Sequence, residues 1–302
     1  LCVPVSTERL VRGPFFCMIQ VISMISFKKF QKTILDWYKK HGRHDLPWRH
    51  TKNPYYILVS ELMLQQTQVD RVIPKYRSFL KKFSTLHNLA KASRASVIKE
   101  WQGLGYNRRA LFLKQSAEKI ILEYKGKFPA SIQDLELLPG IGPYTARAIS
   151  VFAWNTPEIF IETNVRRVFI HFFFLHKKII SDSDILPMIK KSLWKKDPRM
   201  WYSALMDYGA IVLKQIKNPN KKSKHYMKQS PFKGSSRYAR SHLLQYVIYK
   251  EKATFQDIQN FFASDKYLKK HQTKKALQKL LSAMEKEGFL YCKNGAWMVS
   301  PL

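Results

Sequence analysis

Apolar residues recur at helical spacing along most of the chain from Phe27 to about Gly209. Turn signals made of glycine and proline separate the periodic segments. The clearest segments are Ser60–Leu64, which leads one helix, Ala95–Trp101 and Arg108–Tyr124, and the turns lie at Gly103–Gly105, Gly126–Pro129 and Pro139–Gly142. Because no alternating strand pattern of useful length interrupts them, we predict an all-α domain over residues 27–213.

The helical periodicity fails after this domain, and lysine, asparagine, serine and proline dominate residues 214–237. Three further helices are predicted over Tyr238–Lys250, Thr254–Phe262 and His271–Glu287, followed by a hairpin over Phe289–Val299 that turns at Asn294-Gly295. Three helices and a hairpin are typical of a winged helix. We therefore predict a basic linker or loop over 214–237 and a small winged-helix-like α+β domain over 238–302. The lysines of its third helix are consistent with a recognition helix or with a solvated basic face.

The chain carries a large excess of positive charge. Lysine and arginine number 53 against 21 acids, which gives a net charge of +32. So many like charges repel one another in the compact state, and a polyanion relieves this repulsion when its phosphates release counterions. Nucleic acid is therefore the expected partner, with an anionic membrane surface as the alternative.

Cysteine content argues against two further classes of protein. Cys2, Cys17 and Cys292 lie far apart and share no Cys-x-x-Cys spacing. A disulfide framework and a zinc site are therefore not expected, and a reducing compartment fits best.

The N-terminus contains one apolar run, residues 15–27. It is shorter than the roughly 20 residues of a membrane-spanning helix, and no small-residue cleavage site of a signal peptide follows it. We expect residues 1–26 to be an N-terminal extension. In one of two interpretations that stay open, this segment lies upstream of the natural start of the protein, which is then Met18 or Met24.

The segment Leu138–Ala146 carries the first candidate chemistry. Gly140 and Gly142 permit a tight turn that brings backbone N–H groups close to a ligand, and a helix beginning near Pro143 adds its partial positive charge. Such an arrangement binds anions, and in so basic a chain the natural target is a DNA phosphate. The Leu-Pro-Gly-x-Gly pattern alone is only moderately specific, because other helix-turn-helix units use glycine and proline in the same way.

Several ordered motifs resemble those of the helix-hairpin-helix DNA glycosylase superfamily, and within it the MutY adenine glycosylases. The specific motif is Ser60-Glu61-Leu62-Met63-Leu64-Gln65-Gln66-Thr67-Gln68, which resembles MutY rather than the endonuclease III branch. The others are Leu46–Arg49, Gly103–Tyr106, the hairpin at Leu138–Ala146, Asn164–Val168 and Met206–Ala210. The resemblance covers a little over half of the chain. It implies the fold of that superfamily and cleavage of the N-glycosidic bond of a base extruded from the duplex.

The resemblance also implies two catalytic carboxyl groups, one to protonate the leaving base and one to stabilise the sugar. Glu61 would be the general acid that protonates adenine at N7, and its apolar neighbours are compatible with a raised pKa. Glu162 stands where the family carries an aspartate. We expect Glu162 to keep the negative charge beside the sugar, displaced by one methylene, while a degenerate site or one adapted to another base stays open. Tyr144 stands where β-lyases carry a lysine, and a phenol forms no Schiff base.

The remaining matches concern the base pocket and the DNA. Trp48 and Arg49 would line the adenine pocket, although a place in the core is equally open for Trp48. Gln65 and Gln66 would fill or border the gap left by the extruded nucleotide, and Tyr106 would wedge into the base stack. The full set implied to contact DNA is Gln65, Gln66, Tyr106, Gly140, Gly142 and Arg166.

Two features of the family are missing from the sequence. Many members hold a [4Fe–4S] cluster with four cysteines, whereas this chain has no cysteine between Met18 and Tyr291. We therefore expect no cofactor, apart from room for a monovalent cation at the hairpin. The lysines of residues 214–233 are expected either to contact DNA or to belong to a solvated linker. The C-terminal region also does not resemble the α/β domain with which typical MutY enzymes read 8-oxoguanine.

Together these observations predict a monofunctional DNA glycosylase of base excision repair, a hydrolase that removes adenine mispaired with 8-oxoguanine or guanine and has little or no lyase activity. The alternatives are a thymine or uracil mismatch glycosylase and a catalytically inert DNA-binding protein. The expected partner is double-stranded DNA with a mismatched or damaged base pair. We expect a monomer without membrane contact, cytoplasmic and nucleoid-associated if the source is bacterial or archaeal.

Overall fold

The computed structural model describes residues 25–216 and 218–301, which divide into two compact units. The expected extension, with Cys2, Cys17, Met18 and Met24, lies outside the described residues up to position 24. The first unit contains the described residues up to Gly42, Ile161–Trp194 and Met200–Tyr226, and the second contains Arg43–Phe160, Lys195–Arg199 and the part from Met227 onward.

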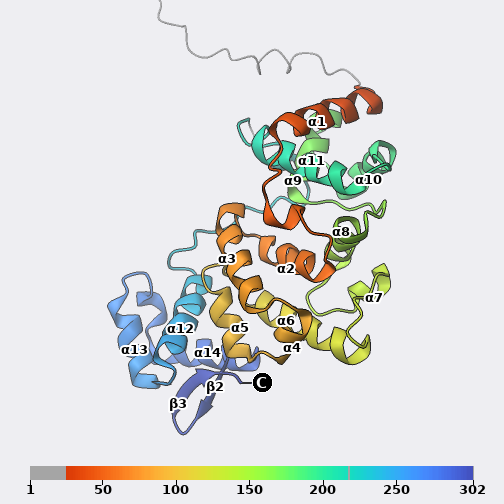
Figure 1. The fold of residues 1–302 in the computed structure, drawn as a ribbon. Helices are drawn as coiled ribbons and strands as arrows, with labels where there is room; N and C mark the ends of the chain where they lie inside the picture. The colour runs from red at the N-terminus through yellow and green to blue at the C-terminus, as the bar shows by residue number, and fades with distance from the viewer. Residues whose placement is uncertain (1–24, 217, 302) are drawn as a thin grey trace, which may run out of the picture. The chain divides into compact units, whose positions relative to one another are not determined.

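The first unit is helical and is held together by aromatic side chains. Phe30 presents its ring to Phe169, Phe173 and Trp201 at centroid distances of 5.4, 5.0 and 5.6 Å, in the edge-to-face geometry that aromatic pairs prefer. These rings join the first, second and fourth of its helices. The helices are α1 (Phe27–His41), α9 (Thr163–Phe173), α10 (Asp182–Ser192), α11 (Pro198–Ile211) and the 3₁₀ turn η3 (Pro219–Lys222) (Figure 1).

The second unit begins with a helical bundle around α2. This helix is buried on nearly all sides and packs against α3, α6 and α8, which is why its sequence is apolar almost throughout. The bundle elements are η2 (Pro47–Arg49), α2 (Pro54–Leu64), α3 (Val69–Lys82), α4 (Leu86–Lys91), α5 (Arg94–Trp101), α6 (Arg108–Glu123), α7 (Ile132–Glu136) and α8 (Pro143–Trp154).

The structure corrects one expectation about α2. Residues Ser60–Leu64 end this helix instead of leading it. The helix begins at Pro54, because Asn53 caps it by accepting a hydrogen bond from the Tyr55 N–H and proline is well suited to the first helical position. Glu61 therefore lies in the last turn, directly before the loop that carries Gln65 and Gln66.

The C-terminal part of the second unit has the predicted winged-helix-like arrangement. Its elements are α12 (Ser236–Lys250), β1 (Ala253–Thr254), α13 (Phe255–Ser264), η4 (Lys269–His271), α14 (Lys274–Lys286), β2 (Leu290–Lys293) and β3 (Ala296–Val299). The three strands form an antiparallel sheet in the order β1-β3-β2. The β2–β3 turn falls at Asn294 and Gly295, whose φ angles of 53° and 74° suit the predicted tight hairpin.

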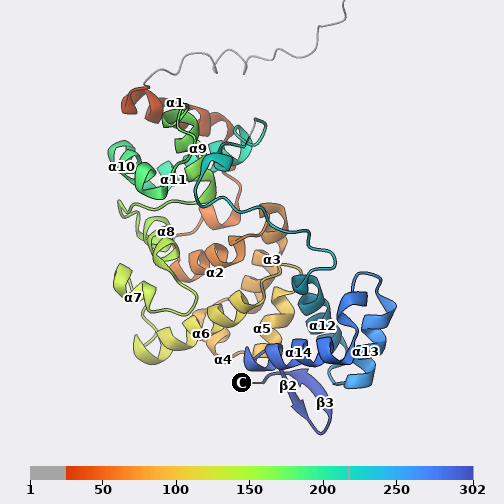
Figure 2. The ribbon, with the colours of Figure 1, turned by 180° about the vertical axis from the view of Figure 1, so that it is seen from behind.

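The C-terminal elements share a hydrophobic core with the bundle. Ile98 of α5 and Leu111 of α6 are buried in the same cluster as Leu244 of α12 and Met284 of α14. Both views of the ribbon place α12 and α14 beside α5 (Figure 2). The fold class is therefore the predicted one, all-α with a small C-terminal α+β part. Within the described residues no helix is long and apolar enough to cross a membrane.

Candidate active site

Glu61 is placed by the packing of α2 against α8. Only 8% of its surface is exposed, and the Tyr144 hydroxyl donates a hydrogen bond of 3.4 Å to its Oε2. Tyr144 is the second residue of α8, so the hairpin that precedes α8 brings its phenol to the carboxyl group. Two of the predicted catalytic residues, which are far apart in sequence, thus lie side by side.

The hairpin itself has the backbone geometry that its glycines predict. Gly140 has a φ of 78°, and a Cβ there would lie 2.7 Å from the Phe112 side chain, so only glycine fits. Gly142 is the N-cap of α8, and a Cβ built on it meets nothing within 4 Å. The hairpin thus ends at a helix N-terminus, the feature on which the predicted phosphate contact rests.

Arg109 connects the end of α2 with the turn before α6. It is 6% exposed, and its guanidinium donates to the carbonyl oxygens of Leu62 and Gln65 at 2.6 Å each and of Gly105 at 2.8 Å. Burial lowers the pKa of Arg109 to about 10, which still leaves it charged at neutral pH. No sequence motif pointed to Arg109, because helical periodicity gives no sign that a particular arginine is buried.

Gln66 and Tyr106 have the unusual backbone conformations of this region. Their φ angles are 54° and 47°, in the left-handed region that non-glycine residues rarely adopt. The side chain of Gln229, from the segment before α12, donates to Gln66 Oε1 at 2.9 Å and to the Tyr106 hydroxyl. Arg237 donates to the same hydroxyl at 3.0 Å. The two residues predicted to enter the duplex are thus held by residues that the motifs did not include.

Gln65 and the predicted pocket residues Trp48 and Arg49 lie in the same unit as Glu61. The Gln65 amide donates to Thr145 Oγ1 at 3.4 Å, which connects α2 to α8 a second time. Trp48 packs edge-on against Tyr76 at 5.5 Å, as a core residue does, and the Arg49 guanidinium donates to the Arg43 carbonyl at 2.9 Å. The roles of Trp48 and Arg49 in an adenine pocket stay predictions.

Glu162 lies in the first unit and caps α9. Its carboxylate accepts hydrogen bonds from the Asn164 backbone N–H at 2.7 Å and from the Asn164 side chain at 3.1 Å. Burial raises the pKa of Glu162, and these hydrogen bonds oppose the shift. Gly209 supports the same turn, since a Cβ there would lie 2.4 Å from the Asn164 carbonyl oxygen. That Glu162 faces the same sugar as Glu61 stays a prediction.

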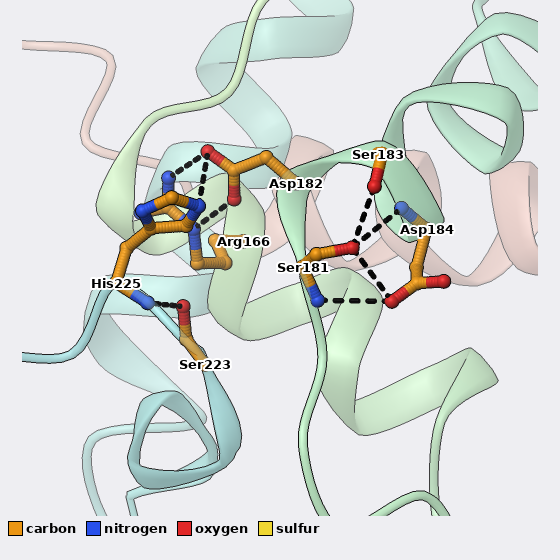
Figure 3. A network of polar contacts seen from close by, with 7 residues as sticks. All are labelled: Arg166, Ser181, Asp182, Ser183, Asp184, Ser223 and His225. Atoms are coloured by element: carbon orange, nitrogen blue, oxygen red, sulfur yellow. Dashed lines mark hydrogen bonds and ion pairs between the residues drawn. The ribbon is translucent and has the colours of Figure 1, made fainter.

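Arg166 has an intramolecular partner in the structure. Its guanidinium donates to both carboxylate oxygens of Asp182, at 2.8 and 2.7 Å. Figure 3 shows this pair beside His225 and the capping box of α10, in which Ser181 and Asp184 exchange hydrogen bonds. The pKa of Asp182 is lowered chiefly by the hydrogen bond from Arg166. A contact between Arg166 and DNA stays a prediction.

The segment that follows α11 forms backbone and side-chain hydrogen bonds with other residues of the first unit. Ile180 and Ser223 form a parallel bridge, in which the Ile180 N–H donates to the Lys222 carbonyl at 2.8 Å and the Lys224 N–H donates to the Ile180 carbonyl at 2.8 Å. The Asn220 amide donates to the Thr163 carbonyl at 3.1 Å. Many family members place their cluster cysteines in this region of the sequence. In this chain, polar contacts hold the same region in place.

The residues of this chain do not fit a [4Fe–4S] cluster. Three cysteines cannot supply four thiolates, and Cys292, the one in the described part, is exposed on β2. Within residues 25–216 and 218–301, no group of three or more histidine, cysteine, aspartate or glutamate side chains could hold a metal ion.

Comparison with known proteins identifies the helical core. Residues 59–195 match the model of the HhH-GPD superfamily of base excision DNA repair proteins. This part of the chain is similar to HhH-GPD proteins. The matched range includes Glu61, the hairpin and Glu162.

Curated proteins similar to this part of the chain are named adenine DNA glycosylase. The chain is 37% identical over 187 residues to the one from Buchnera aphidicola subsp. Baizongia pistaciae, with 61% of this chain and 52% of that protein covered. It is 45% identical over 136 residues to the Mycolicibacterium smegmatis protein, with 45% and 46% covered. For the Homo sapiens protein the values are 40% over 200 residues, with 61% and 36% covered. The chain thus spans about half the length, or less, of these relatives.

Solved structures give the same fold. A thermostable thymine-DNA glycosylase is similar with a TM-score of 0.56 and 27% identity, over 65% of this chain and 91% of that one. An endonuclease III in a non-covalent DNA complex is similar with a TM-score of 0.53 and 20% identity, over 62% and 87%. The second likeness concerns the fold alone.

Proposed function

We propose that this protein is a monofunctional DNA glycosylase of base excision repair that hydrolyses the N-glycosidic bond of adenine mispaired with 8-oxoguanine or guanine. The observation that carries the proposal is Glu61. It is a buried carboxyl group in the Ser-Glu-Leu-Met-Leu-Gln-Gln-Thr-Gln motif, in contact with Tyr144 from the hairpin helix. The similarity of 37 to 45% to proteins named adenine DNA glycosylase supports the same substrate.

Each catalytic step has a residue to perform it. Glu61 in its acid form donates a proton to N7 of the extruded adenine, so the C1′–N9 bond breaks and leaves its electron pair on a neutral base. The carboxylate of Glu162 stabilises the positive charge that develops on the sugar. Water then adds at C1′ and gives up a proton, which restores the acid form of Glu61. Tyr144 offers no amine, so the strand is not cut through a Schiff base.

Double-stranded DNA with a mismatched or damaged base pair is the proposed partner. The net charge of +32 supports attraction to phosphates, and the position of Gly142 at the N-terminus of α8 supports a phosphate contact of the hairpin. We also propose that the enzyme works without an iron–sulfur cluster, as a monomer, and that in a bacterial or archaeal cell it acts on the nucleoid in the cytoplasm.

A thymine or uracil mismatch glycosylase is the second candidate. It is favoured by the likeness to the thymine-DNA glycosylase, which shares the fold at 27% identity. The higher identity to relatives named adenine DNA glycosylase places adenine first.

One assay separates these activities. Duplexes that carry A opposite 8-oxoguanine, A opposite G, T opposite G and U opposite G are incubated with excess protein and scored for alkali-labile sites. The proposal expects cleavable sites at adenine alone. Release of thymine or uracil alone would reject the adenine assignment, and no release from any duplex would support an inert DNA-binding protein.

A further inference from the structure

A cavity of about 670 Å³ lies inside the second unit, beside the predicted wedge residues. One wall consists of Gln66 and the turn Gly103–Arg109, which includes Tyr106. The other wall consists of residues from the segment before α12, from α12 itself and from the end of α14, among them Gln229 and Arg237. The C-terminal elements therefore complete a pocket that the bundle alone would leave as an open surface.

The lining has the chemistry of a nucleotide site. Half of its lining residues are arginines, glutamines or asparagine, and within the described chain no acidic residue lines it. Guanidinium groups bind phosphate oxygens or the O6 and N7 acceptors of a purine, and amides both donate to and accept from base edges. The rings of Tyr106 and Phe232, which are 38% and 48% exposed, add surfaces on which a base can stack. The volume lies within the range of pockets that hold ligands of nucleotide size.

Most of the arginines of this cavity already serve the protein's own structure. Arg109 donates to backbone carbonyls, Arg240 pairs with Glu287 at 2.6 Å, and Arg71 donates to the Gly103 carbonyl. Arg237 differs, since its guanidinium donates to the Tyr106 hydroxyl at 3.0 Å and to the Ser230 carbonyl at 2.8 Å. The Gln229 amide also donates hydrogen bonds to the Tyr106 hydroxyl and to Gln66 Oε1. These two side chains contact the residues that would enter the base stack, so they are the ones that meet the nucleotide there.

We propose that this cavity binds the nucleotide opposite the extruded base, and that Gln229 and Arg237 determine which opposite base is accepted. The inference rests on the proposed function. In the protein without DNA, Gln229 and Arg237 hold the Tyr106 hydroxyl. When Tyr106 enters the stack, they exchange this partner for the edge of the displaced base. The C-terminal part thus contributes to specificity.

The test measures binding without catalysis. Duplexes carry a tetrahydrofuran abasic-site analogue opposite guanine, 8-oxoguanine, cytosine or thymine, and the affinity of the full chain for each is measured by fluorescence anisotropy. The wild-type protein is expected to discriminate between the best and the worst opposite base by about tenfold or more, the effect of one good base contact. In Gln229→Ala and Arg237→Ala this ratio should fall to about threefold or less.

Two further variants separate base reading from charge and from folding. Lys228→Ala removes one exposed positive charge next to Gln229, at a residue outside the cavity lining. This substitution should lower the affinity for all four duplexes in equal proportion. Arg237→Lys keeps the charge but loses the planar fork, and should lose discrimination as Arg237→Ala does. Thermal unfolding followed by circular dichroism identifies any variant that fails to fold.

Several outcomes would overturn the proposal. It is wrong if the wild-type protein binds the four duplexes equally, if the two alanine variants keep the wild-type ratio, or if they behave like Lys228→Ala. Failure of the proposed function is seen separately, because it shows as absence of adenine release by the wild-type protein in the four-duplex assay.

Discussion

At the scale of single residues, the candidate site depends on one contact between two sequence motifs. Glu61 ends a buried helix and Tyr144 begins another, and their side chains meet at 3.4 Å. The motifs predicted both residues, because their chemistry is tied to a specific string of neighbours. The motifs could not predict Gln229 and Arg237, since these residues reach Tyr106 from more than 120 positions away in the sequence.

The identity of residue 144 predicts how the enzyme responds to a reducing agent. Wild-type protein with adenine-containing duplex and borohydride should give no covalent protein–DNA complex, because a phenol cannot form an imine. Tyr144→Lys places an amine beside Glu61 and should give such a complex, visible as a slower band in denaturing gels. Efficient trapping of the wild-type protein would show that another amine attacks the sugar and that the reaction is not monofunctional.

At the scale of structural elements, Arg109 joins the end of α2 to the turn that carries Tyr106. Its guanidinium donates hydrogen bonds to the backbone carbonyls of Leu62, Gln65 and Gly105, which lie at the end of the helix and of the turn. Carbonyls at such ends have no partner within their own element, so a buried donor from elsewhere stabilises both. The helices could be predicted from periodicity, whereas this connection could not, because a buried and an exposed arginine look alike in sequence.

This connection predicts a large loss of stability in Arg109→Met. The variant keeps much of the side-chain volume but leaves several buried carbonyls without a donor, so the free energy of unfolding should fall by about 3 kcal/mol. Arg108→Met changes the exposed neighbour in the same helix and should cost no more than about 0.5 kcal/mol. Urea unfolding measures both, and equal effects of the two substitutions would contradict the account.

The start of α10 predicts a dependence of stability on acid. Hydrogen bonds from Lys177 and Ser181 lower the pKa of Asp184 to about 2, below the ordinary value of 3.8. A depressed pKa in the folded protein means that the stabilisation is complete above the ordinary value and is lost as the pH falls toward 2. Asp184→Asn should therefore be less stable than wild type at pH 6, and the difference should shrink toward pH 2.5. A constant difference in urea unfolding across this range would contradict the assignment.

Local composition does not reveal which segments of the chain pair with one another. Residues 218–226 have the composition of a linker or loop, and the bridge between Ile180 and Ser223 and the hydrogen bond from Asn220 to Thr163 hold them in place. Such pairings connect distant parts of the chain, so local composition does not reveal them. The C-terminal helices and the hairpin at Asn294-Gly295, by contrast, depend on local signals and were predictable within a few residues.

At the scale of the whole molecule, the net charge of +32 governs how the protein meets its partner. Attraction of this kind depends on counterion release and not on base sequence.

The charge predicts a steep salt dependence of DNA affinity. If about six phosphates are neutralised, the affinity for a duplex with the tetrahydrofuran analogue should fall about a thousandfold between 50 and 200 mM salt. Anisotropy titrations at several salt concentrations give the slope. An affinity that barely changes over this range would reject the electrostatic account.

The most direct test of the central claim, that a proton from Glu61 releases adenine, is the rate of adenine release by wild type and Glu61→Gln. Free adenine from a duplex with A opposite 8-oxoguanine is measured by chromatography under single-turnover conditions, and affinity for the tetrahydrofuran duplex is measured alongside. We predict that the substitution lowers the rate by about a thousandfold or more and changes the affinity by less than about threefold. Release of adenine by Glu61→Gln at the wild-type rate would remove Glu61 from the mechanism and contradict the account.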